Sequence, residues 1–135
     1  MRAFMVTLLL VLASAACAPS ASSGADDGSE WRYDFQVAIP LSGGDFGTES
    51  QFQRYGRVEE KLMNAVDEAG GILDGNDIGD GFYTIYVLSD DLDGTLDLMQ
   101  RELAPEDLPA GSTLRVYEWQ PGGRQGEPIR EVPVE

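Results

Sequence analysis

The chain has no histidine, a single lysine (Lys61) and a single cysteine (Cys17) among its 135 residues. Without histidine there is no imidazole general base, no Ser-His or Cys-His nucleophile pair and no His-ligated zinc. One cysteine cannot form an internal disulfide or a thiolate zinc cage. Ser42 has no plausible base, and the paired glycines are not phosphate loops because no Lys-Ser/Thr follows them. We therefore expect no catalysis and no cofactor.

Positive charge is also scarce, with 9 basic residues against 24 acidic ones and a net charge of −15. Such a surface repels phosphate backbones, so we expect no nucleic-acid partner. The length allows one domain. Its core is modest, and we expect no large internal ligand cavity.

The first 16 residues have the pattern of a signal peptide: Arg2, an apolar run over residues 3–12, and small residues 13–16. The run is too short to span a bilayer, which takes about 20 apolar residues. Residues 17–30 are small and polar, which is typical of a flexible tether. The α+β domain is expected over residues 31–119, followed by a Pro/Gly loop and C-terminal tail over residues 120–135.

Ser14-Ala15-Ala16-Cys17 resembles the lipobox of bacterial lipoprotein precursors, although that family usually has Leu where this chain has Ser14. The resemblance implies that Cys17 is lipidated and becomes the first mature residue. It also implies a protein of the cell envelope, held on a membrane by its N-terminal lipid on the periplasmic or extracellular side. The alternative is ordinary secretion as a soluble protein, with cleavage after Ala15 or Ala18.

From residue 31 on, the spacing of apolar residues predicts six elements in the order strand, helix, short strand, strand, helix, strand. Residues 31–39 alternate as a half-buried strand, Thr48 and Gln51 form a capping box, and Asp90 or Asp91 caps the second helix. We predict a ferredoxin-like α+β sandwich (βαββαβ), with two helices on one face of an antiparallel sheet. The last strand should lie beside the first, and the first beside the third. A three-strand layer is the fallback if Ile72-Leu73 does not pair.

The sheet face turned away from the helices is the first candidate site. Alternation with Phe35 and Val37 inward leaves Asp34 and Gln36 outward, and on the third strand we favour Thr84 outward. Interfaces are enriched in aromatic residues and arginine, and the predicted partner-binding residues on this face are Arg32, Tyr86, Arg115, Tyr117 and Trp119. Two alternatives remain: a tail containing Ile129, Val132 and Val134 folds over this face, or two copies pack sheet to sheet.

The acidic segment from Asp74 to Gly81 is the second candidate. Its side chains Asp74, Asn76, Asp77 and Asp80 offer oxygens to a hard cation such as Ca²⁺. The segment does not fit an EF-hand, because Ile78 and Ile85 stand where ligands are needed. We favour a solvated hairpin connection whose residues supply turn geometry, and expect no metal site.

Within residues 70–104, the run DGNDIGDGFYTIYVLSDDLDGTLDLM resembles a group of small, uncharacterised bacterial proteins. They carry a DGNE-type loop, an apolar strand and an acidic helix start; here Asp77 replaces the Glu. The resemblance implies a compact α+β domain and no particular activity.

These patterns together predict an acidic envelope lipoprotein that acts as a non-catalytic protein-interaction module. One version is an immunity or inhibitor protein that meets a basic partner, since charge complementarity speeds association. The alternative is a divalent-cation or small-ligand binding module that uses residues 74–80.

Overall fold

The computed structural model describes residues 31–120 and 126–135, so the predictions for residues 1–30 and for loop residues 121–125 lie outside it. The elements, in chain order, are β1 (Tyr33–Pro40), α1 (Glu49–Glu68), β2 (Ile72–Gly79), β3 (Phe82–Ser89), α2 (Leu92–Leu103), the 3₁₀ turn η1 (Ala104–Glu106), β4 (Thr113–Glu118) and β5 (Arg130–Pro133). In these two segments no helix has the length and hydropathy needed to cross a bilayer.

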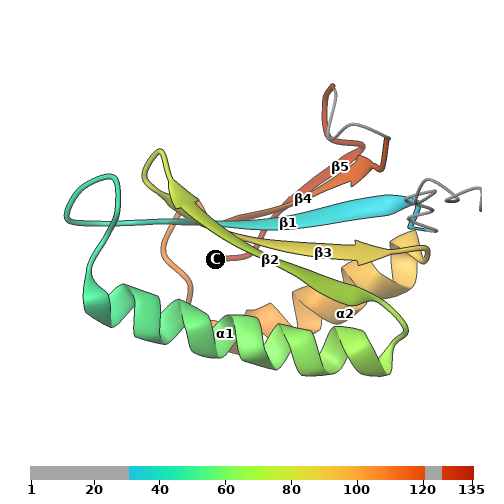
Figure 1. Ribbon diagram of the computed structural model, residues 1–135, viewed down its shortest axis with the longest axis horizontal. Helices are drawn as coiled ribbons and strands as arrows, with labels where there is room; N and C mark the ends of the chain where they lie inside the picture. Colours follow the sequence, from blue (N-terminus) through green and yellow to red (C-terminus); the bar gives the residue numbers. More distant parts are fainter. Residues whose placement is uncertain (1–30, 121–125) are drawn as a thin grey trace, which may run out of the picture.

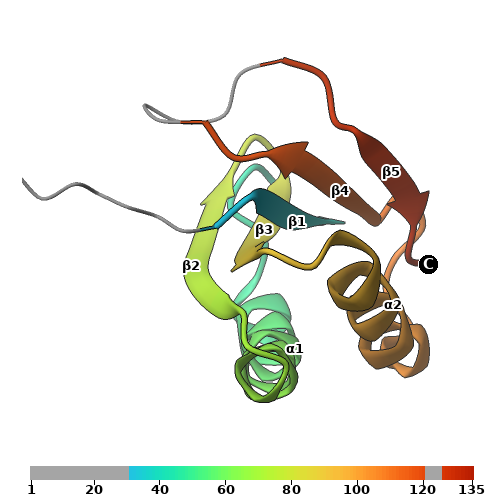
Figure 2. The same ribbon diagram turned by 90° about the vertical axis from the view of Figure 1, so that its right-hand side faces the viewer.

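The strands form one antiparallel sheet in the order β2-β3-β1-β4-β5. Figures 1 and 2 show both helices on one face of the sheet. The α+β class is therefore confirmed, as is the position of β1 between β3 and β4. The βαββαβ order is not matched in full, because β5 adds a fifth strand at the edge.

The strand β5 corrects the description of the C-terminal segment as a tail. It pairs with β4, where Val132 lies opposite Leu114. Val132 and Val134 pack against the hydrophobic core on the helix side. They do not fold over the other sheet face, so that alternative is wrong.

The core follows from strand alternation and helical spacing. Inward positions of the strands meet the apolar faces of α1 and α2, and the third strand points inward with Tyr83, Ile85 and Val87, as predicted. Fully buried side chains come from every layer: Phe35, Val37, Ile39, Val58, Leu62, Val66, Ile85, Val87, Met99, Leu103, Leu114 and Val116.

Hydrogen bonds from polar and charged side chains stabilise the ends of the two helices. The predicted capping box of Thr48 and Gln51 is present at the start of α1, and Asp91 caps α2 by accepting from Gly94 N at 3.0 Å. Arg54 on α1 donates to backbone carbonyls at the end of η1. Cations are favoured there because the last carbonyls of a helix lack intrahelical partners.

The strand β2 corrects the prediction of a short strand followed by a long turn. The pairing with β3 runs from Ile72 to Gly79, with a bulge between Leu73 and Gly75. The turn is only Asp80-Gly81, whose φ angles are 53° and 81°. Positive φ at both central residues is the type I′ hairpin geometry that Asp-Gly favours.

Candidate functional site

We call the sheet face opposite α1 and α2 the open face. The strand registers align its side chains in rows: Gln36 on β1 lies between Tyr86 on β3 and Arg115 on β4. In the next row Thr84 lies opposite Asp77 of β2. Because alternate residues of a strand share a face, these polar and aromatic side chains gather over the middle of the sheet.

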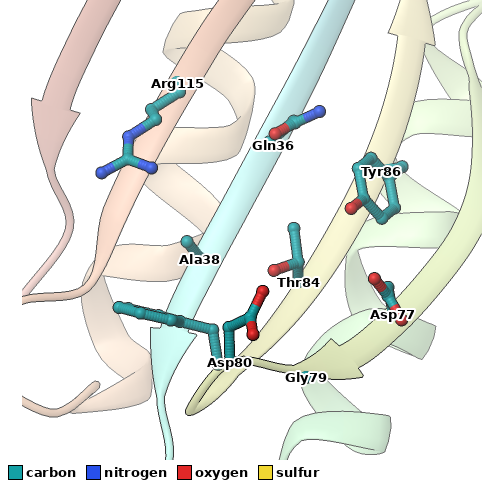
Figure 3. A pocket seen from close by; sticks show the side chains of 9 residues that line it. Gln36, Ala38, Asp77, Gly79, Asp80, Thr84, Tyr86 and Arg115 are labelled. Atoms are coloured by element: carbon teal, nitrogen blue, oxygen red, sulfur yellow. The ribbon is translucent and has the colours of Figure 1, made fainter. Parts of the chain in front are cut away.

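These rows form a depression of about 190 Å³, which we call the hollow (Figure 3). Ala38 and Gly79 are small and leave room at its floor and rim. Asp80 reaches it from the hairpin turn, and Figure 3 shows its carboxylate beside Thr84. The residues that line the hollow are Gln36, Ala38, Asp77, Gly79, Asp80, Phe82, Thr84, Tyr86 and Arg115. Ligand pockets commonly span about 300–1,000 Å³, so the hollow fits one side chain better than a cofactor.

The polar groups that line the hollow include two carboxylates, which only accept hydrogen bonds, and the guanidinium of Arg115, which only donates them. Gln36 is only 7 % exposed, and its Nε2 donates to Asp34 Oδ2 at 3.0 Å. This bond leaves the amide oxygen of Gln36 on the Arg115 side of the hollow (Figure 3). The Nε of Arg115 lies 3.4 Å from Glu131 Oε1, an ion pair directed toward β5.

The five predicted partner-binding residues do not form one cluster. Tyr86 and Arg115 line the hollow, and Tyr117 lies further along β4, opposite Asp34. Arg32 and Trp119 lie beyond the ends of β1 and β4, where Trp119 N donates to Arg32 O at 2.8 Å. The Arg32 guanidinium lies 5.7 Å from the centre of the Tyr33 ring.

The acidic segment is divided between the two sheet faces. Asp77 and Asp80 line the hollow, whereas Asn76 lies on the helix side and donates to both carboxylate oxygens of Glu59, at 3.1 and 2.9 Å. Asp74 lies at the bulge. The four side chains therefore do not converge, and the described part of the chain holds no group of three or more His, Cys, Asp or Glu residues suited to a metal ion.

Glu59 forms a second polar cluster between α1 and the sheet. The hydroxyl of Tyr83, a residue only 4 % exposed, donates to Glu59 Oε2 at 2.5 Å. Burial, and then the bond to Glu59, raise the pKa of the Tyr83 phenol well above its usual value. The cluster connects α1 to β2 and β3 and does not reach the hollow, which lies on the other face of the sheet.

Lys61, two residues after Glu59 in α1, has a structural role at the contact with the C-terminal end of α2. Its Nζ lies 2.7 Å from Glu106 Oε1 and donates to Glu102 O at 2.8 Å. The bond to Glu106 raises the pKa of this amine. The only lysine thus joins α1 to the end of α2, far from the Ser42 loop.

Sequence reasoning did not bring Asp77, Asp80, Thr84 and Gln36 together as one site. Alternation had already placed Gln36 and Thr84 outward. The sequence does contain a signal that could have joined them. Asp80-Gly81 is typical of a two-residue hairpin turn, which fixes the register of β2 and with it the position of Asp77.

Comparison with known proteins adds no assignment: no family model, no curated protein and no solved structure matches this chain.

Proposed function

We propose that this chain is an envelope lipoprotein whose domain binds a partner protein through the open face, without catalysis. One observation carries the proposal: neither helix covers this face of the sheet, yet it holds a hollow lined by acidic, aromatic and arginine side chains (Figures 2 and 3). Tyrosine and arginine are the residues on which interface energy most often depends.

The charge of the chain favours a basic partner. With a net charge of −15, the protein attracts basic surfaces at long range, which raises the association rate and disfavours acidic partners. An immunity or inhibitor protein that neutralises a basic toxin or enzyme fits this chemistry. A divalent-cation site is less well supported, because Asn76 and Asp77 lie on opposite faces of the sheet.

The same proposal includes a finer description of the fold. We propose a ferredoxin-like sandwich extended by one strand. Its support is the order of the first four strands, β2-β3-β1-β4, together with two helices on one face. β5 then lengthens the sheet beyond β4 and does not itself cover the open face.

The location in the envelope depends on Cys17. Lipidation there would hold the domain at the membrane behind a tether of residues 17–30, where an arriving partner would meet it. Labelling cells with a radioactive fatty acid tests this step: label should enter the wild-type chain and be absent from Cys17→Ala. Equal labelling of both chains, or of neither, overturns the lipoprotein assignment.

Affinity capture from cross-linked membranes tests the binding function. The full chain with a C-terminal tag should retain one near-stoichiometric protein. The double variant Tyr86→Ala/Tyr117→Ala should lose it, because both rings lie on the open face. The control Gln53→Ala/Met63→Ala, at exposed positions of α1 and without a change of net charge, should keep it. Capture that survives the tyrosine variant shows that the open face is the wrong surface.

An empty capture would count against the partner-protein proposal. In that case, a melting temperature that rises with millimolar Ca²⁺ would favour the cation-binding alternative. The rise would have to disappear in Asp74→Ala/Asp77→Ala.

A further inference from the structure

The hollow combines two carboxylates that lack a cationic partner within the described residues. No ion pair there involves Asp77 or Asp80. Asp77 Oδ1 accepts from the backbone N–H of Ile78 at 2.8 Å, and the Asp77 side chain lines the hollow. In Figure 3 the two carboxylates lie on either side of Thr84.

A third acceptor comes from a nearly buried side chain. Gln36 is only 7 % exposed, and the one hydrogen bond that its side chain makes within the described residues is the one that Nε2 donates to Asp34. That bond fixes the orientation of the amide, so its Oε1 is held in the hollow without a donor. An acceptor in a fixed position beside two carboxylates favours a ligand that brings several N–H donors.

The size and the aromatic lining narrow the choice of ligand. A volume of about 190 Å³ admits the head of one long side chain. The rings of Tyr86 and Phe82 line the hollow, and aromatic faces attract flat cations. A guanidinium is planar, always charged and carries five N–H donors in a fixed fork, whereas an anion would meet the carboxylates and be repelled.

We propose that the hollow is a receptor for an arginine side chain presented by the partner. This inference rests on the proposed function and names the chemistry of its contact. The guanidinium bridges Asp77 and Asp80, donates to Gln36 Oε1 and stacks on an aromatic ring. Arg115 does not occupy the hollow itself, because its guanidinium is paired with Glu131 toward β5.

The test uses N-acetyl-arginine methylamide as the probe and the ¹⁵N-labelled full chain. A ¹H–¹⁵N spectral titration should show saturable shifts at the amides of residues 77, 80 and 84. The citrulline analogue has the same shape without the charge, and it should cause no saturable shift. The lysine analogue should bind several-fold more weakly, because an ammonium has no planar fork. Uniform shifts over the whole acidic surface, or equal binding of citrulline, would overturn the proposal.

Two variants with the same change of net charge separate the hollow from general attraction. Asp77→Asn/Asp80→Asn should weaken arginine binding at least tenfold. The fold should tolerate it, because asparagine is favoured at the positive φ of a type I′ turn and still offers an acceptor to Ile78 N. The control Glu60→Gln/Asp97→Asn, at exposed positions of α1 and α2, should change the affinity less than twofold. Equal weakening by both variants refutes a specific receptor.

The inference and the proposed function can fail separately. If capture depends on Tyr86 and Tyr117 while the arginine probe does not bind, the open face binds its partner and the arginine receptor is refuted. If the probe binds in the hollow while capture is empty, the hollow binds a guanidinium, and a partner protein as the source of that arginine is refuted.

Discussion

Removing one buried hydroxyl tests the polar contact that connects α1 to the sheet. The Tyr83 hydroxyl donates to Glu59 Oε2 at 2.5 Å, and Tyr83 is only 4 % exposed. A hydrogen bond to a charged acceptor contributes about 1.5–3 kcal/mol. In Tyr83→Phe, Asn76 still donates to Glu59, so we expect a loss of about 1–2 kcal/mol at pH 8. For a domain of this size the melting temperature should fall by roughly 5–15 °C.

The pH dependence of this loss follows from the raised pKa of Tyr83. An unfolded tyrosine releases its proton near pH 10, whereas folded Tyr83 keeps its proton to higher pH. Above pH 10 the unfolded state therefore binds fewer protons than the folded state, and the free energy of unfolding of the wild type falls as pH rises. From this group alone the fall should reach about 1.4 kcal/mol at pH 11. Tyr83→Phe lacks the group, so its stability deficit should shrink to near zero between about pH 11 and 11.5.

Urea unfolding of both proteins at pH 8, 10 and 11 measures this difference. Effects from other tyrosines and from Lys61 are common to both proteins and cancel. Glu59→Gln provides a second reading: it removes the charge but leaves the burial of Tyr83, which is the larger cause of the shift. Its pH dependence should therefore decrease without vanishing. A deficit of Tyr83→Phe that stays constant from pH 8 to 11 would refute the reasoning.

Three further predictions concern the stability that an ion pair, a helix cap and a hairpin turn contribute to the fold. Lys61→Met should lower the free energy of unfolding by about 1 kcal/mol in urea titrations, because it breaks a partly exposed ion pair with Glu106. Asp91→Ala should cost about 1 kcal/mol in the same assay by leaving Gly94 N without its cap; no change would show that the cap is dispensable. Gly81→Ala should lower the thermal midpoint by several degrees, since its φ of 81° strains an L-residue, whereas Gly79→Ala should have a smaller effect.

The elements with regular apolar spacing could be predicted from the sequence, and β2 shows why an irregular one could not. Leu73 and Ile78 both pack against the core, although an odd separation in an unbroken strand would put them on opposite faces. The bulge between Leu73 and Gly75 restores their common direction. Glycine, asparagine and aspartate are also poor strand formers. The segment is a strand because it pairs with β3 across the Asp80-Gly81 turn. The strand propensities of its single residues do not include this pairing.

The candidate site was predictable only where it depends on alternation within one strand. Alternation along β3 and β4 depends on local sequence, so Tyr86, Arg115 and Tyr117 could be assigned to the open face. The position of Asp77 depends on the register of β2, and that of Asp80 on the hairpin turn. A pattern of single residues therefore located the face, while the hollow appears only when β1, β2, β3 and β4 are aligned.

Two polar side chains are nearly buried at the centre of the open face. Asp34 and Gln36 are 4 % and 7 % exposed on the middle strand, where apolar side chains of similar size would avoid the cost of burying polar groups. Local departures from the pattern that best serves the fold are expected at functional sites. The bond between these two residues orients the Gln36 oxygen toward the hollow. Gln36→Leu removes this oxygen from the hollow, so arginine binding should weaken. It also removes the donor to Asp34 Oδ2, so the thermal midpoint should fall by several degrees. Unchanged arginine binding in this variant would assign Gln36 to the fold alone.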